Sequence, residues 1–232
     1  MAALRLGDIA PDFEADTTIG HIRFHDYIKD SWAILFSHPD DFTPVCTTEL
    51  SAVSVTGEEF AKRGVKMLGL SANNVDSHHE WVKDINNLNP SAPQLDFPII
   101  GDKSREIATT YGMLDKQDLT NVEKSTGLPF TVRLVYIVDP KQTIRLMLAY
   151  PASVGRNFAE ILRCIDALQL GDKYKITTPA NWKVDFNGKT EERVIVHPSV
   201  QGEKVKELFG DNVETVYPYL RFTTNPEQKQ KA

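Results

Sequence analysis

An apolar run gives way to a helical pattern within residues 32–46, which read Trp32-Ala33-Ile34-Leu35-Phe36-Ser37-His38-Pro39-Asp40-Asp41-Phe42-Thr43-Pro44-Val45-Cys46. The five apolar residues at its start are typical of a buried strand. Thr43 is a natural helix N-cap, and Pro44 a natural first helical residue, because the N–H that proline lacks would be unpaired there. The stretch therefore predicts a strand followed by a helix with Cys46 in its first turn.

The same alternation of strand and helix continues along the chain. Further apolar runs predict strands at 65–72, 97–101 and 132–138, and helical spacing predicts helices at 44–63, 76–88 and 104–112. This order favours an α/β fold with a largely parallel sheet. After a turn at Asp139-Pro140, residues 143–150 are expected to return as an antiparallel strand, and residues 157–170 to form a helix that Gly171 ends.

The charge balance changes near residue 172. Residues 1–172 carry 16 Lys and Arg against 24 Asp and Glu, whereas residues 173–232 carry 10 against 8. The second part also differs in its pattern of turn residues. Pro179, Pro198 and Asn187-Gly188 predict turns between short strands there. We therefore expect two domains, 1–172 and 173–232.

Composition excludes several classes of protein. The net charge of −6 and the lack of a long Lys/Arg run argue against a nucleic-acid partner. No apolar run approaches the ~18 residues of an integral membrane segment. The N-terminal residues resemble no secretory signal, so an intracellular, cytoplasmic location is expected. Two cysteines, 118 positions apart at Cys46 and Cys164, fit neither a disulfide scaffold nor a zinc site.

Cys46 is the candidate reactive group. In the first turn of a helix, unpaired backbone N–H groups and the helix dipole both favour a negative sulfur. The alternative is a small buried apolar residue, which is the commoner fate of an intracellular cysteine. Cys164 lies in the middle of a predicted helix, beside its apolar stripe, so a packing role is expected there.

These residues resemble a known family. The run from Phe42 to Leu50, Phe-Thr-Pro-Val-Cys-Thr-Thr-Glu-Leu, is similar to the peroxidatic motif of the one-cysteine peroxiredoxins; the two-cysteine branch has Val-Cys-Pro-Thr-Glu instead. The resemblance extends along nearly the whole chain, through Pro11-Asp12-Phe13, Arg133, Tyr150-Pro151, Gly155-Arg156-Asn157, Thr178-Pro179 with Trp182, and Tyr219-Leu220-Arg221.

The resemblance implies a thioredoxin-like fold with a small C-terminal dimerisation domain, and hence a homodimer. It implies reduction of hydrogen peroxide and organic hydroperoxides by Cys46, which cycles through a sulfenic acid and is restored by an external thiol reductant, glutathione or a thiol protein. It also implies the roles of six further residues. Thr43 would bind the thiolate and the peroxide, Arg133 would stabilise both, Pro39 would shield the pocket, Glu49 and Arg156 would orient the arginine, and His38 would lie beside the cysteine.

The chemistry of peroxide reduction agrees with this set of residues. A thiolate attacks one oxygen while negative charge builds on the other, so the site needs an ionised thiol and donors for the departing oxygen. A hydroxyl, first-turn N–H groups and an arginine supply these without a metal or another cofactor. Asp41 could oppose ionisation if it pointed inward, whereas Asp40 is expected to face water.

The sequence also allows other functions. Some relatives are reported to have phospholipase A2 activity, for which Ser31, His25 and Asp139 are the matching positions, but the glycines that flank the serine in those relatives are Lys29-Asp30 and Ala33 here. A redox-regulated chaperone or binding protein of the same fold is another alternative. A dithiol oxidoreductase is not expected, because Thr43 stands where its second cysteine would be. His78-His79-Glu80 is interpreted as a solvated helix face rather than a metal site.

Overall fold

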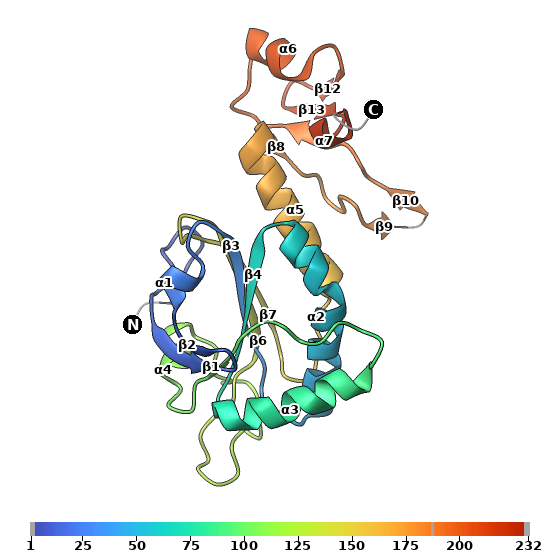
Figure 1. Ribbon diagram of the computed structural model, residues 1–232. Coiled ribbons are helices and arrows are strands. Elements are labelled where there is room, and N and C mark those ends of the chain that lie inside the picture. Colours follow the sequence, from blue (N-terminus) through green and yellow to red (C-terminus); the bar gives the residue numbers. More distant parts are fainter. Residues whose placement is uncertain (1–2, 187, 230–232) are drawn as a thin grey trace. The chain divides into compact units, whose positions relative to one another are not determined.

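The computed structural model describes residues 3–186 and 188–229, and its chain divides into two compact units, Met1–Phe158 and Ala159–Ala232. The first unit contains one seven-stranded sheet with the strand order β2-β1-β5-β4-β3-β6-β7 (Figure 1). Its strands are β1 (Glu14–Thr17), β2 (Gly20–Arg23), β3 (Trp32–Ser37), β4 (Val65–Ser71), β5 (Ile99–Gly101), β6 (Arg133–Val138) and β7 (Ile144–Tyr150).

The sheet is mixed, which corrects the expectation of a largely parallel one. Only the β3–β4 and β4–β5 pairs are parallel, and each is connected through a long helix. The pairs β1–β2, β1–β5, β3–β6 and β6–β7 are antiparallel. The chain reaches β6 through the loop 111–132 rather than through a crossover helix, and so it can enter beside β3 in the opposite direction.

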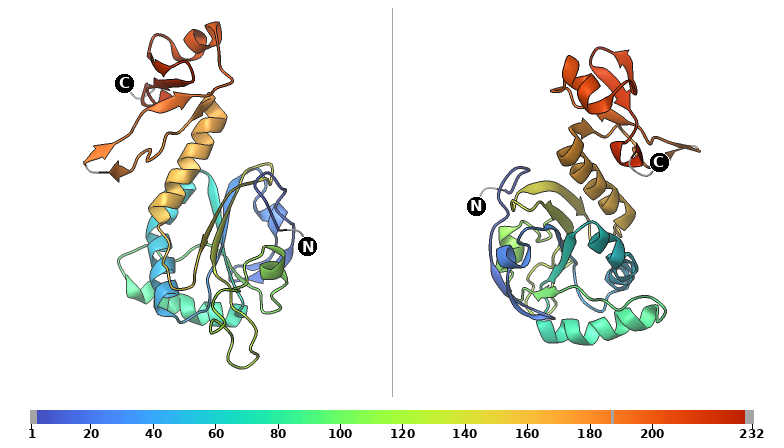
Figure 2. Two further views of the ribbon diagram at one scale, coloured as in Figure 1. Left: turned by 180° about the vertical axis from the view of Figure 1, so that it is seen from behind. Right: turned by 45° about the horizontal axis from the view of Figure 1, so that its top comes forward.

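Four helices of the first unit cover the sheet: α1 (Phe24–Tyr27), α2 (Pro44–Lys62), α3 (Val75–Leu88) and α4 (Glu106–Thr110). Helices α2 and α3 lie on one side of the sheet and α1 and α4 on the other, as both views of Figure 2 show. The β3 residues 33–36 are fully buried between these layers, which explains their unbroken apolar pattern.

The core on the α1 and α4 side joins residues that are far apart in the sequence. Phe24 stacks on Phe13 with ring centroids 4.8 Å apart, and Tyr111 meets Tyr136 edge-on at 5.2 Å. The two tyrosine hydroxyls donate hydrogen bonds to backbone carbonyls, those of Pro11 and Tyr111. This packing fixes the edge of the sheet and the antiparallel strands that carry Arg133.

The second unit begins within α5 (Phe158–Tyr174) and has its own small core around Trp182, which is fully buried. A four-stranded sheet of order β12-β13-β11-β8 is formed by β12 (Val213–Tyr217), β13 (Leu220–Thr223), β11 (Val194–Val196) and β8 (Ile176–Thr177). The remaining elements are β9 (Asp185–Phe186), β10 (Lys189–Thr190), α6 (Glu203–Phe209) and α7 (Pro226–Lys229).

Gly171 does not end α5, contrary to expectation. The helix continues to Tyr174, and a Cβ at Gly171 would come within 3.2 Å of the Ile176 carbonyl oxygen. The glycine therefore allows a close approach of the chain rather than a helix stop. Within residues 3–186 and 188–229, no helix combines the length and apolar character needed to cross a bilayer.

Candidate active site

Cys46 is the third residue of α2 and is fully buried; the loop 38–43 connects the carboxyl end of β3 to this helix. Thr43 is the N-cap by position, with extended backbone, and Pro44 begins the helix. The Thr43 hydroxyl does not cap the helix, contrary to expectation. It donates a 2.8 Å hydrogen bond to the Asp40 carbonyl oxygen, which draws the loop 40–43 into a tight turn. The first-turn N–H groups are therefore left without the usual side-chain acceptor.

Arg133 contacts the sulfur of Cys46. It is the first residue of β6 and is almost fully buried, and its Nη1 lies 3.3 Å from Cys46 Sγ and 2.7 Å from Glu49 Oε2. The Ala152 carbonyl oxygen accepts from Nε and Nη2 of the same guanidinium at 3.0 and 2.7 Å. The guanidinium is thus held on both sides, and one of its N–H groups is directed at the sulfur.

Glu49 connects Arg133 to a second arginine, Arg156. The Arg156 guanidinium donates to Glu49 Oε1 at 3.0 Å and to Oε2 at 2.8 Å, and the Arg156 backbone N–H also donates to Oε1 at 2.7 Å. Its remaining Nη1 donates to the Ser37 carbonyl oxygen at 2.9 Å. Burial would raise the pKa of Glu49, but the charge and hydrogen bonds of Arg156, together with the charge of Arg133, outweigh it and lower the pKa.

A pocket of about 340 Å³ opens beside these groups. Its lining includes Pro39, Thr43, Val45 and Arg133, so the arginine that contacts Cys46 Sγ also reaches the pocket. Pro39 itself is buried. The structure thus brings together Cys46, Arg133, Glu49 and Arg156 through direct contacts, and places Pro39 and Thr43 on the wall of the adjoining pocket.

His38 and Asp41 are buried next to this region. His38 Nε2 lies 2.8 Å from Asp41 Oδ1, and neither side chain is exposed. The second Asp41 oxygen is bound by His78 of α3, whose Nδ1 lies 2.8 Å from Oδ2. His78 is fully buried, so the interpretation of 78–80 as a solvated face is wrong for this residue. It holds only for its exposed neighbours, His79 and Glu80.

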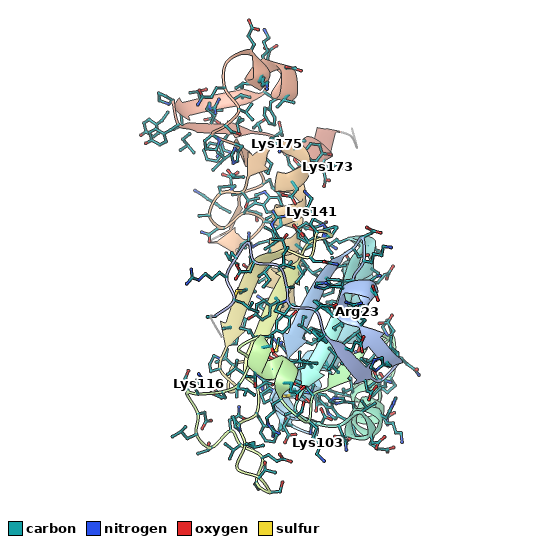
Figure 3. All side chains as sticks on the ribbon, turned by 90° about the vertical axis from the view of Figure 1, so that its left-hand side faces the viewer. Arg23, Lys103, Lys116, Lys141, Lys173 and Lys175 are labelled. Atoms are coloured by element: carbon teal, nitrogen blue, oxygen red, sulfur yellow. The ribbon has the colours of Figure 1, made fainter. Side chains whose placement is uncertain are left out.

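Asp40 does not simply face water, as was expected from the sequence. It is half-buried, and its Oδ1 accepts a 2.7 Å hydrogen bond from Asn73 Nδ2. Burial raises the pKa of Asp40, and the charge of neighbouring Asp41 acts in the same direction. Asp40 also lines a second, more polar pocket together with Asn73 and Lys103. Figure 3 shows Lys103 at the end of the first unit where the parallel strands terminate.

Comparison with known proteins gives a consistent result. Residues 6–147 match the AhpC/TSA family, and residues 167–211 match the C-terminal domain of 1-Cys peroxiredoxin. The chain is 49% identical to peroxiredoxin-6 of Rattus norvegicus, over 96% of this chain and 98% of the relative. It is equally identical to a mitochondrial peroxiredoxin of Saccharomyces cerevisiae, over 95% of this chain and 80% of that one. The chain belongs to the one-cysteine peroxiredoxins.

Solved structures of peroxiredoxins agree with this assignment and confirm the thioredoxin-like fold with an added C-terminal domain. A crystal structure of a cysteine-to-serine mutant of peroxiredoxin 6 from Arenicola marina superposes with a TM-score of 0.88 at 44% identity and covers 97% of this chain and 100% of its own. A yeast mitochondrial 1-Cys peroxiredoxin gives 0.82 at 46% identity, with 95% and 99% covered. This peroxiredoxin is accordingly an oxidoreductase, a thiol-dependent peroxidase.

The two cysteines of the peroxiredoxin have different surroundings. Both are free thiols. Burial raises the pKa of Cys164 to about 11, and its Sγ donates a 3.3 Å hydrogen bond to Glu160 Oε1, which stabilises the protonated form. No guanidinium pair comparable to Arg133 and Arg156 surrounds Cys164 among the residues described, although Arg163 Nη2 lies 3.8 Å from its sulfur.

The positions considered for a phospholipase bond to other groups. The Ser31 hydroxyl donates to the Lys29 carbonyl oxygen at 3.3 Å, and His25 Nε2 donates to the Ala10 carbonyl oxygen at 2.7 Å. Asp139 accepts from the N–H groups of its own turn and from Arg145. These contacts do not assemble Ser31, His25 and Asp139 into a hydrogen-bonded serine triad.

Sequence reasoning missed several groups of the site. The carbonyl oxygens of Ala152 and Ser37 orient the two arginines, and backbone atoms leave no signature in a side-chain pattern. His78 was visible in the sequence. The helical positions that it shares with buried Trp81 and Ile85, three and seven residues further on, are the signal that would have placed it on the inner face of α3.

Proposed function

We propose that Cys46 is the peroxidatic cysteine, and that it reduces hydrogen peroxide and organic hydroperoxides. The observation that carries this proposal is the 3.3 Å contact between Arg133 Nη1 and Cys46 Sγ in the first turn of α2. A buried guanidinium beside a helix N-terminus favours the thiolate, which is the form that attacks peroxide.

The reaction then follows from the positions of the donors. The Cys46 thiolate attacks one peroxide oxygen with an electron pair, an S–O bond forms, and the O–O bond breaks. The departing oxygen leaves with that bonding pair and takes up a proton to become water or an alcohol, while the sulfur becomes a sulfenic acid. Arg133 stabilises the thiolate and the charge on the departing oxygen. The Thr43 hydroxyl, whose proton goes to the Asp40 carbonyl oxygen, accepts the peroxide O–H from the pocket wall. Pro39 shields the pocket from water.

Glu49 and Arg156 support this step without touching the peroxide. Arg133 alone could turn towards any acceptor, but Glu49 Oε2 and the Ala152 carbonyl oxygen fix its plane. Arg156 supplies the second positive charge that balances the buried system. His38, which directly follows β3, lies beside this group of residues and is the family position next to the cysteine.

An external thiol completes the cycle. Glutathione or a thiol protein attacks the Cys46 sulfenic acid, releases water and forms a mixed disulfide, which a second thiol then reduces. The structure of the yeast 1-Cys peroxiredoxin is described as showing a thiol resolving mechanism through the glutathione and thioredoxin systems, which supports this class of reductant. The high pKa of Cys164 argues against an internal resolving thiol.

The assembly that we propose is a homodimer built with the C-terminal unit. The match to the C-terminal domain of 1-Cys peroxiredoxin supports it, as do Tyr217 and Tyr219, which stack at 5.4 Å and are 53% and 77% exposed. We place the functional boundary of the two domains near residue 172, where the charge balance changes. We also propose a cytoplasmic location, although one relative is mitochondrial.

The test compares two serine variants. Cys46→Ser should abolish peroxide consumption, because a serine hydroxyl is not ionised near neutral pH, whereas Cys164→Ser is the matched control and should retain most of the activity. Peroxide consumption with glutathione as reductant measures both. Equal losses in two folded variants would mean that Cys164 takes part in the cycle and that the one-cysteine mechanism is wrong.

A further inference from the structure

A buried cluster of two histidines and one aspartate lies between the β3–α2 loop and α3. Asp41 is at its centre. His38 Nε2 and His78 Nδ1 each lie 2.8 Å from one of its carboxylate oxygens, and the Ser77 hydroxyl donates to Oδ2 at 2.7 Å. Both histidines and the Asp41 side chain are fully shielded from solvent. Because water does not reach these groups, their charges and hydrogen-bonding atoms must be satisfied by one another and by the surrounding protein.

Each ring nitrogen of His78 has a buried hydrogen-bond partner. Its Nδ1 faces Asp41, and its Nε2 lies 3.1 Å from the Ile100 carbonyl oxygen, which can only accept. Burial would raise the pKa of Asp41, but hydrogen bonds from His38 and His78 lower it well below its ordinary value, so Asp41 is a carboxylate. Both ring nitrogens of His78 therefore face hydrogen-bond acceptors, the Asp41 carboxylate and the Ile100 carbonyl oxygen.

The partners of His38 determine its tautomer. Its Nε2 faces the Asp41 carboxylate and therefore carries a proton, whereas its buried Nδ1 has no hydrogen-bond partner among residues 3–186 and 188–229. Burial lowers the pKa of His38, and the positive charges of His78 and Arg156 act in the same direction against the opposing effect of Asp41. His38 is consequently neutral, and its Nδ1 presents a lone pair.

A metal ion would require a different arrangement. The ligand atoms of His38, Asp41 and His78 lie within 4.8 Å of one another, as in many metal sites. Two nitrogen-to-oxygen distances of 2.8 Å, however, are those of hydrogen bonds, with a proton between each pair. Ligands bound to zinc at about 2.0 Å in a tetrahedron lie more than 3 Å apart. The two distances of 2.8 Å between histidine nitrogens and Asp41 oxygens therefore fit hydrogen bonds, and they are too short for two ligands of one tetrahedral zinc ion.

We propose that Asp41 and His78 are positioning residues of the peroxidase site: their ion pair fixes His38 as the neutral Nε2–H tautomer with Nδ1 free to accept. The inference rests on the proposed function of the Cys46 site. His38 lies between Ser37, whose carbonyl oxygen holds Arg156, and Pro39, which lines the pocket. His38 thus joins the residue that holds Arg156 to a residue of the pocket wall, and the charge of Arg156 acts on its ring.

Nitrogen-15 NMR of histidine side chains tests the protonation states directly in the unmodified protein. Near neutral pH, His78 should show two protonated ring nitrogens, and His38 should show a protonated Nε2 with a bare Nδ1. Signals are assigned by their loss in His38→Asn and His78→Asn. A neutral His78, or a His38 protonated at Nδ1, would overturn the proposal without any reference to activity.

Substitutions then test the link to the reaction. In Asp41→Asn, the amide oxygen accepts from His78 and the amide nitrogen donates to His38 Nε2, so the His38 proton should move to Nδ1. In His78→Asn, the cation is lost, and His38 should hold a second proton to higher pH. In both variants the single-turnover rate of Cys46 oxidation by hydrogen peroxide should fall by tenfold or more.

The matched control is His79→Asn, which changes the exposed neighbour of His78 on the same helix and should alter neither the His38 signals nor the rate. Near-UV circular dichroism shows whether each variant is folded. Unchanged oxidation rates in a folded Asp41→Asn or His78→Asn protein would overturn the positioning role. Cys46→Ser reports separately on the proposed function, since its retained activity would refute that function and leave the NMR result intact.

Discussion

At the scale of single residues, Glu49 determines how the two arginines of the site point. It lies three residues after Cys46 on α2, so both side chains occupy the same face of the helix. Its carboxylate accepts from Arg133 at 2.7 Å and from Arg156 at 2.8 Å, and all three groups are buried. Without this anion, two buried guanidinium groups would repel one another beside the thiol, so Glu49 is a condition for the Arg133–Cys46 contact.

Arg133→Met tests that contact. The variant keeps an unbranched apolar stem but removes the guanidinium and with it the donor 3.3 Å from Cys46 Sγ. The fraction of thiolate near neutral pH should fall, and the rate of peroxide attack should fall by about 100-fold or more, as expected for loss of a buried donor to developing charge. Thiolate absorbance and stopped-flow oxidation measure the two effects. Arg23→Met, at an exposed position of β2, serves as the control, and equal behaviour of the two variants would remove Arg133 from the site.

His38 predicts a dependence of stability on pH. Its folded-state pKa is lowered from the ordinary 6.5, chiefly by burial. Above pH 6.5 the ring is neutral in both states, and the contribution of His38 to stability is fully present. Below pH 6.5 the unfolded chain binds a proton that the folded protein does not, so the unfolding free energy falls by up to about 1.4 kcal/mol per pH unit until the folded-state pKa is reached.

Denaturant unfolding between pH 7 and 5 measures this slope. His38→Asn should flatten it, because the substituted residue binds no proton in either state. His79→Asn, at an exposed position, should leave it unchanged. If the slope of His38→Asn matched that of the unmodified protein, the depressed pKa would have to belong to another group.

At the scale of elements, the starts of α2 and α3 form the site together. Trp81 of α3 donates through Nε1 to the Thr47 hydroxyl of α2 at 3.1 Å, next to Cys46. Helix α2 was predictable because Thr43, Pro44 and the apolar spacing all indicate the same start. The strands β1 and β2 and the helix α1 could not be predicted, because each of the three has only four residues. Four residues are too few to show a hydrophobic period.

Gly101 sets the distance between β5 and α3. A Cβ at this position would lie 2.9 Å from the Val75 backbone nitrogen at the start of α3, and a backbone atom cannot move away cheaply. Gly101→Ala should lower the unfolding free energy by about 1–3 kcal/mol. Gly57→Ala, inside α2 with its nearest neighbours at 3.7 and 3.8 Å, should instead be neutral or stabilise by up to about 1 kcal/mol.

Chemical denaturation of the two alanine variants decides this prediction. The pair is matched in chemistry and differs only in the room around the new methyl group. Equal stabilities would mean that α3 can shift away from β5 without cost. The buried cluster around His78, close to the start of α3, would then not be rigidly placed.

At the scale of the whole molecule, the sequence predicted residues that the structure brings into contact around Cys46, but not the backbone groups that hold them. Cys46 could be singled out from its place in the first turn of a helix, whereas Arg133, Glu49 and Arg156 could be singled out only through the resemblance to the one-cysteine peroxiredoxins. The antiparallel entry of β6 and the Ala152 carbonyl could not, since strand direction and backbone contacts depend on how distant segments pair. The burial of His78 was missed for a related reason: adjacent histidines were considered as a pair, although α3 buries one and exposes the other.

The chain as a whole holds no second reactive thiol for Cys46. Cys164, with a pKa of about 11, is almost entirely protonated near neutral pH, and the thiolate is the form that attacks a sulfenic acid. Rising peroxide without reductant should therefore convert Cys46 to sulfinic and sulfonic acid, with irreversible loss of activity. Peptide mass spectrometry after graded peroxide measures this, and a Cys46–Cys164 disulfide in place of these species would refute it.

The central claim is that Cys46 alone carries out the attack on peroxide, and trapping its first product tests this most directly. The protein is treated with one equivalent of hydrogen peroxide in the presence of dimedone, which reacts with sulfenic acids, and is then digested for peptide mass spectrometry. We predict that the adduct forms on the peptide containing Cys46 and is absent from the peptide containing Cys164. An adduct on Cys164, or complete consumption of the peroxide with Cys46 left unmodified and unoxidised, would contradict the account.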